Sequence, residues 1–390
     1  MSTLRDLDIM HAHMGIFDKR NLVLADRWLM LAAFTLAAVG VLTLYSASRS
    51  AYSEIPYYVK QLAWLGMGGV LAAVIVCLDY RFLISLAPIF YVLSIVLLVM
   101  VMFWGTTVKG GQRWLEFGPI GGQPSEFAKV ALVYMLAWYF STIKQRVRSF
   151  PFFIGAFVIA GIPIALILKQ PNLGTAMLMV PVLFVMLYVA GCKRWHMAAV
   201  VLVVLAAAPV AWSQLKDYQK DRILTFQDPS SDPRGKGWQT IQTMITVGSG
   251  GMAGKGFRQG TQTHLSFLPE HHTDFIFSLL AEETGFLGGA AVIALFGVLL
   301  LRGLSLARGS PELQGTLIGV GAATILGFHV FVNIAITIGM LPVTGIPLPF
   351  LSYGGSFYLT TMMCVGAMLS VNIPKGMFSN KGAGQSQPQK

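Results

Sequence analysis

Charged residues are scarce in this sequence. Asp, Glu, Lys and Arg together make up 12% of its 390 residues, whereas 55% are hydrophobic, and the mean hydropathy is +0.66. Soluble globular proteins carry about 25% charged residues, so the composition excludes that class and indicates an integral membrane protein. Because no soluble domain is left to present a basic face, the sequence also argues against nucleic acid as a partner.

Cysteine is rarer still. Cys77, Cys192 and Cys364 lie in or beside apolar segments, and their spacing matches no zinc or redox motif. We therefore expect them to be buried structural residues, without a disulfide framework. The formal net charge of +11 is explained mainly by basic residues that face the anionic headgroups of membrane lipids.

Long apolar runs are abundant. A helix needs about 20 apolar residues to cross a hydrocarbon core of about 30 Å. Runs of this kind recur along the whole chain and predict an all-α, polytopic membrane protein with about ten transmembrane helices. The expected spans are roughly 28–46, 61–78, 82–104, 126–143, 152–168, 174–190, 195–214, 274–301, 314–338 and 350–372.

The basic residues predict the orientation of these spans. The amino-terminal segment, the short loops on its side and the carboxyl tail hold 15 of the 28 Lys and Arg residues, and the short loops on the other side hold five. The positive-inside rule then places both termini in the cytoplasm and one long loop, about 215–273, outside between the seventh and eighth spans.

Three regions follow from this topology. Residues 1–27 mix acids with bases and lack the apolar core of a cleavable signal, so we expect a cytoplasmic segment. Residues 28–373 form the transmembrane domain. The polar, Gly- and Gln-rich tail 374–390 is expected to be disordered and cytoplasmic.

Ionisable side chains within spans are costly and indicate functional sites. In "QPSEFAKV", Glu126 and Lys129 stand three residues apart at the start of the fourth span, a spacing that lets them pair on a helix. Two interpretations remain open. The pair either neutralises itself so that the helix can insert, or it serves a polar cavity.

The stretch "PEHHTDFIFSLLAEETGFLGG" places Asp274 at the head of an apolar span, two residues after the pair His271 and His272. A helical wheel puts Asp274 on a stripe of small or polar residues, which indicates that it faces protein or a cavity. The stripe comprises Ser278, Ala281, Glu282, Gly285 and Gly288. Glu283 projects to the apolar side and requires a partner on another helix.

Several roles suit Asp274. It is a candidate general base, proton-relay member or cation ligand, and the alternative is a helix cap. The loop that precedes it is basic and rich in glycine, which suits an anionic, lipid-linked substrate. Within this loop, "GSGGMAGKG" does not have the glycine spacing of a nucleotide-binding loop.

Five blocks carry a family resemblance. They are "KGGQRWLEFG", "QPSEFAKV", "QPNLGT", "FLPEHHTDFIFSLLAEETGFLGG" and "GIPLPFLSYGGS", in this order over about residues 105–360. Together they resemble the shape, elongation, division and sporulation (SEDS) family of peptidoglycan polymerases. "KGGQRW", "GTQTHLSFLPE" and "GIPLPFLSYGGS" are more similar to the elongation branch, RodA, than to the division branch, FtsW.

The resemblance implies a ten-helix glycosyltransferase of the bacterial cell membrane that polymerises lipid II, an undecaprenyl-pyrophosphate disaccharide pentapeptide. It implies a class B penicillin-binding transpeptidase and other elongation-complex proteins as partners. The family's essential acid falls on Asp274 and its cavity residues on Arg113, Glu126 and Lys129, with Arg222 as a weaker correspondence. The family's "QPDLGT" reads "QPNLGT" here, so Asn172 puts a charge-dependent role at that position in doubt.

The chemistry is consistent with these residues. Lipid II is an α-linked donor and the product is β-1,4-linked, so an inverting transfer needs one general base, for which Asp274 is the candidate. No nucleotide cofactor is needed because the donor is already activated. A divalent cation such as Mg²⁺ would assist the leaving pyrophosphate, although no cluster of carboxylates in the sequence indicates a metal site. The alternatives are a lipid II flippase and a scaffold for the transpeptidase.

Overall fold

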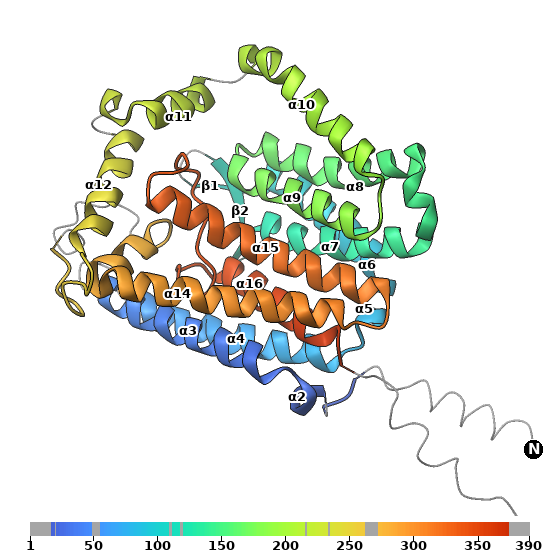
Figure 1. Ribbon diagram of the computed structural model, residues 1–390, viewed down its shortest axis with the longest axis horizontal. Coiled ribbons are helices and arrows are strands. Elements are labelled where there is room, and N and C mark those ends of the chain that lie inside the picture. The colour runs from blue at the N-terminus through green and yellow to red at the C-terminus, as the bar shows by residue number, and fades with distance from the viewer. Residues whose placement is uncertain are drawn as a thin grey trace, which may run out of the picture.

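The computed structural model describes residues 17–19, 21–48, 55–108, 111–117, 120–214, 217–232, 235–261 and 272–373. Figure 1 shows a bundle of long helices from which one arc of helices extends. The expected tail 374–390 and most of the expected segment 1–27 lie outside the described residues.

Ten helices of at least 16 residues occur in the described part of the chain, and each overlaps one of the ten expected spans. They are α3 (Arg27–Ala47), α4 (Tyr57–Cys77), α6 (Ala87–Trp104), α7 (Pro124–Ile143), α8 (Phe150–Lys169), α9 (Leu173–Val189), α10 (Arg194–Gln214), α14 (Ile276–Arg308), α15 (Leu313–Thr337) and α16 (Gly355–Ser370). Two short helices, α2 (Asn21–Leu24) and α5 (Tyr80–Ser85), accompany them. The predicted polytopic helical fold is confirmed.

The helices differ in how they meet the membrane. Six of those described, namely α3, α4, α6, α8, α14 and α15, are long and apolar enough to cross it. Helices α9 and α16 and the Arg194–Ala207 part of α10 are shorter apolar helices. Most of α15 and α7 is buried among the other helices, whereas α3, α4 and α6 expose large apolar side chains such as Phe34, Val70 and Phe103. These outward faces suit contact with lipid.

The segment predicted as one long loop contains secondary structure. Helix α11 (Asp217–Gln227), a 3₁₀ turn (Pro229–Ser231) and α12 (Lys236–Ser249) lie between α10 and α14. In Figure 1 these helices and α10 form an arc that leaves the bundle along α10 and returns to it through α12. Helix α12 packs against α14 and α15 and buries a polar face that includes Thr243 and Thr246.

A small antiparallel sheet lies between α6 and α7. Strand β2 (Gly111–Phe117) pairs with β1 (Thr106–Val108) on one side and with β3 (Ile120–Gly122) on the other. The sequence analysis treated this region as a loop. Strand β2 carries Arg113.

Helix α14 is interrupted at Gly285, whose φ of 68° and ψ of −166° are not helical. The glycine-rich segment 250–256 fills the interruption and provides hydrogen-bond partners that the broken helix lacks. Four backbone N–H groups donate over 2.9–3.2 Å across this junction: Phe286 to Gly251, Leu287 to Met252, Lys255 to Glu282 and Gly256 to Glu283.

Glycine is required at the centre of this junction. Gly254 has a φ of +80°, and a Cβ atom there would lie 2.1 Å from the carbonyl oxygen of Glu283. Both the backbone conformation and the close approach therefore exclude a larger residue. The segment "GSGGMAGKG" thus serves to complete a broken helix, which explains its glycines without a nucleotide.

Candidate active site

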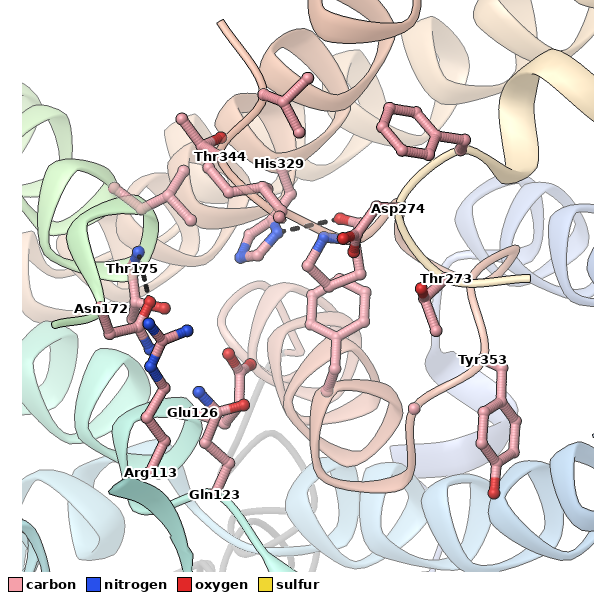
Figure 2. Close-up of a pocket in the computed structure, with 18 of the residues that line it drawn as sticks. Arg113, Gln123, Glu126, Asn172, Thr175, Thr273, Asp274, His329, Thr344 and Tyr353 are labelled. Carbon is pink, nitrogen blue, oxygen red and sulfur yellow. Dashed lines mark hydrogen bonds between the residues drawn. The ribbon is translucent and has the colours of Figure 1, made fainter. Parts of the chain in front are cut away.

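A cavity of about 440 Å³ lies among β2, α7, α9, α12, α15 and the segments that flank α14 and α16. Its lining combines polar and apolar side chains. The polar and charged side chains include Arg113, Gln123, Glu126, Asn172, Thr175, Gln239, Thr273, Asp274, His329, Thr344 and Tyr353. Figure 2 shows Arg113, Glu126 and Asn172 on one side of the open space and Asp274 on the other, with His329 between the two sides.

Asp274 lies in the turn that precedes α14, which begins two residues later at Ile276. Three consecutive carbonyl groups hold this turn. The carbonyl of His272 accepts from the N–H of Tyr353 over 3.0 Å, that of Thr273 accepts from the Ser352 hydroxyl, and that of Asp274 accepts from the Asn333 amide over 2.8 Å. Hydrogen bonds to these backbone carbonyls therefore fix the position of the turn that carries Asp274.

The wall beside Asp274 is formed by the segment that precedes α16. Gly345 has a φ of +72°, and a Cβ atom at this position would lie 3.5 Å from Asp274 Oδ2. The next residue, Ile346, is bound through its carbonyl to the same Asn333 amide over 2.7 Å. One buried asparagine thus joins the turn of Asp274 to the opposite wall.

Glu126 and Lys129 form the expected pair at the start of α7. Lys129 Nζ lies 2.9 Å from Glu126 Oε1, and the two residues are 2% and 5% exposed, respectively. Lys129 has a second contact that the sequence analysis missed, with His329 Nε2 at 2.8 Å. Glu126 lines the cavity, whereas Lys129 lies behind it and is not among the described residues of the lining.

Arg113 reaches the cavity from β2. Its Nε donates to the carbonyl of Gln170 over 3.2 Å, and its Nη2 donates to the carbonyl of Pro171. These bonds orient the guanidinium, which has five N–H donors in total. Arg113 therefore supplies a fixed positive charge to one side of the cavity.

Asn172 also lines the cavity and has a clear local role. It is the N-cap of α9, where its side-chain oxygen accepts from the N–H of Thr175 at 3.4 Å. An aspartate would cap the helix about equally well. Relative to the aspartate that the resemblance implies at this position, Asn172 therefore preserves the cap and removes a negative charge from the cavity.

The two glutamates of α14 lie outside the cavity. Glu282 was expected on the same face as Asp274, but it is fully buried and pairs with Lys255 at 2.7 Å. Glu283 accepts from the Ser46 hydroxyl of α3 and from the N–H of Arg258 at 3.2 Å. Both acids thus fasten the 250–261 segment to the helices. The predicted stripe also ends at Gly285, because the interruption of α14 changes the direction of every later side chain.

Other expected site residues are only partly described. Arg222 lies in α11, but its side chain lies outside the described residues, as does His271. The ring of His272 stacks on Tyr57 with centroids 4.3 Å apart. Tyr353 lines the cavity, and its ring lies close to the rings of Tyr57 and His272. Burial raises the pKa of the Tyr353 hydroxyl, and nearby Tyr57 adds to the effect, so this hydroxyl remains a donor at neutral pH.

The sequence analysis missed His329 and Asn333. Both stand on one face of α15, four residues apart in "FHVFVN", and both are almost fully buried. Two polar residues at this spacing within an apolar span were the available signal.

The donor set gives no independent indication of a metal. Among the described residues, no group of three or more His, Cys, Asp or Glu side chains is placed to hold one. Asp274 and Glu126 are the two carboxylates of the cavity lining.

Comparison with known proteins gives consistent results. The FtsW/RodA/SpoVE cell cycle protein model matches residues 26–375. The peptidoglycan glycosyltransferase MrdB of Escherichia coli (strain K12) is 37% identical over 358 residues, which cover 91% of this chain and 95% of MrdB. The peptidoglycan glycosyltransferase RodA of Treponema pallidum (strain Nichols) is 33% identical, with 89% of this chain and 97% of that protein covered.

Solved structures are similar as well. A chain from a peptidoglycan synthase complex that coordinates polymerization and crosslinking has a TM-score of 0.77 and 32% identity, over 89% of this chain and 97% of that one. The rod shape determining protein RodA of Thermus thermophilus has a TM-score of 0.67 and 30% identity, over 89% of this chain and 96% of that one. As its motifs predict, this multi-pass membrane protein belongs to the FtsW/RodA/SpoVE family, the SEDS family of cell cycle proteins.

Proposed function

We propose that the protein is a peptidoglycan glycosyltransferase of cell elongation that polymerises lipid II into glycan strands. The observation that carries this proposal is one polar cavity with the carboxylate of Asp274 on one side and the guanidinium of Arg113 on the other. Relatives over nearly the whole chain that are named peptidoglycan glycosyltransferases support the same activity.

The reaction is an inverting displacement at the anomeric carbon of the donor sugar. The acceptor hydroxyl oxygen attacks this carbon while Asp274 takes the hydroxyl proton. The bond from the anomeric carbon to the pyrophosphate oxygen breaks, and the leaving pyrophosphate keeps the electron pair. Hydrogen bonds to backbone carbonyls hold the turn of Asp274, which places this residue at the cavity where it acts as the base.

The departing pyrophosphate gains negative charge that must be stabilised. Arg113 suits this role because two backbone carbonyls orient its guanidinium and because its fork of N–H donors matches phosphate geometry. Arg222 is a further proposed contact. Lys129 acts from behind Glu126, so its charge supports the cavity without direct contact.

The proposed orientation places both termini in the cytoplasm and the segment between α10 and α14 outside the cell membrane. The charge asymmetry supports it, since Lys144, Arg146 and Arg148 lie together in the short turn after α7. Single cysteines in this turn and in residues 217–232 test the proposal with a thiol reagent that cannot cross the membrane. Labelling of the α7 turn in intact cells would contradict it.

We also propose a class B penicillin-binding transpeptidase as the partner. A similar chain is part of a peptidoglycan synthase complex, and such a partner would couple polymerisation to crosslinking. The transpeptidase should copurify with this protein and raise its polymerisation rate. Absence of both effects would weaken the assignment to the elongation branch.

The decisive experiment is incubation of the purified protein with lipid II in detergent, in the absence of any other polymerase. We expect glycan polymer on gels. The buried ion pair of α7 would also suit a flippase, so the same protein is placed in vesicles that carry a fluorescent lipid II. Transport without polymer would favour the flippase, and neither activity would favour a scaffold.

A further inference from the structure

His329 is a buried histidine of α15 that lies between the two sides of the cavity. It is 1% exposed and makes two polar contacts, with Pro347 O at 3.1 Å through Nδ1 and with Lys129 Nζ at 2.8 Å through Nε2. Its ring packs on Phe357, with centroids 4.7 Å apart. These contacts fix both the position and the direction of the imidazole.

The two partners select one form of the ring. A carbonyl oxygen only accepts, so Nδ1 must carry a hydrogen. An ammonium group only donates, so Nε2 must present its lone pair. The neutral imidazole with its hydrogen on Nδ1 is therefore the form that satisfies both contacts.

This arrangement determines which oxygen of Glu126 is paired with Lys129. Lys129 donates to Glu126 Oε1 at 2.9 Å and is held from the other side by His329, so the ammonium stays against that one oxygen. Glu126 Oε2 is buried and has no hydrogen-bond partner in the described part of the chain. Glu126 lines the cavity and points into it in Figure 2. A buried carboxylate oxygen without a donor is costly, which indicates that a ligand supplies one.

Helix α15 supports both halves of the site. His329 holds the ion pair of α7, and Asn333, one turn later, holds the carbonyl of Asp274. Pro347 and Ile346, adjacent in the chain, accept from these same two side chains. The spacing between Glu126 and Asp274 is therefore set by one helix and one short segment.

We propose that His329 is a positioning residue of the polymerase: it holds Lys129 on one oxygen of Glu126 so that the other oxygen accepts a hydrogen bond from a hydroxyl or amide N–H of the saccharide substrate. This inference rests on the proposed function. The alternative is a histidine that only fills space and satisfies its neighbours. The two roles differ in what an apolar residue at this position would do.

The test compares His329→Gln with His329→Leu and His329→Met in lipid II polymerisation, with kcat, KM and thermal stability measured on the same detergent preparations. Glutamine keeps one donor and one acceptor, whereas leucine and methionine fill the volume without either. Loss of correct positioning typically costs about 100-fold in rate. We expect kcat to fall by about this factor in the apolar variants with little change in KM, and glutamine to restore most of it.

The control is His196→Leu, since His196 lies on α10 against Phe150 and Phe153 and outside the cavity lining. It should retain wild-type activity. A folded His329→Leu or His329→Met protein with wild-type kcat would overturn the proposal, as would equal loss in a folded His329→Gln protein. Activity that falls only in step with thermal stability across the three variants would assign His329 to the fold alone. If the wild type itself makes no glycan, the proposed function fails and the inference falls with it.

Discussion

The substitution Asp274→Asn tests the proposed base without changing the hydrogen bonds that hold its turn. The three hydrogen bonds that hold residues 272–274 use backbone carbonyls, and the substitution leaves all three in place. It removes the proton acceptor. Loss of a general base costs a factor of about 100 to 10,000 in rate, which corresponds to about 2.7–5.4 kcal/mol in the activation barrier at 1.36 kcal/mol per factor of ten.

The assay is lipid II polymerisation by the purified variant beside wild type, with lipid II binding and thermal unfolding followed on the same preparations. We expect polymer near background, with binding and the unfolding temperature almost unchanged. Glu312→Gln is the matched control, because Glu312 pairs with Arg81 at a partly exposed position remote from the cavity. Near-normal polymer from stable Asp274→Asn protein would refute Asp274 as the general base. A loss of stability in step with the loss of activity would favour a structural role for Asp274.

Three further predictions concern the supports of the site. The double change Glu126→Gln with Lys129→Met removes both charges together, so no unpaired ion is left. We expect a folded protein without polymerase activity. An active double variant would indicate that the pair serves only to let the helix insert into the membrane. Gly254→Ala should lower stability by about 1–3 kcal/mol more than Gly191→Ala in thermal unfolding, because both positions have positive φ but only the first meets a carbonyl oxygen. Asn172→Ala should destabilise the protein by about 1 kcal/mol through loss of the α9 cap, whereas Asn172→Asp should not. Equal unfolding temperatures for the Ala and Asp variants would show that the cap does not contribute to stability.

Much of the fold follows from hydropathy alone, because a span must be long and apolar whatever it contacts. All ten expected spans coincide with helices, and the expected boundaries differ from the observed ones by only a few residues at most ends. The pairing of Glu126 with Lys129 was equally accessible, since it depends on local helical spacing. Asp274 could be proposed from its placement at the end of an apolar run.

The remaining features depend on contacts between distant segments. The helical wheel assumed one continuous helix from Asp274 onward, and it failed at Gly285 because residues 250–256 replace the local hydrogen bonds there. For the same reason Glu282 pairs with Lys255 instead of facing the cavity. His329 was overlooked because its two partners, Lys129 and Pro347, come from α7 and from the segment before α16.

The interruption of α14 explains how an acid can be held accurately at the edge of an apolar bundle. Residues 276–284 form a short helical piece between the turn of Asp274 and Gly285. The Asn333 side chain of α15 holds the preceding turn through the carbonyl of Asp274, and backbone hydrogen bonds to residues 250–256 hold the other end of the piece. The part of α14 after the break is bound to the same segment, because the N–H groups of Phe286 and Leu287 donate to the carbonyls of Gly251 and Met252. Residues 250–256 therefore link the two parts of α14, so we expect a displacement of this segment to move both parts, including the piece that follows Asp274.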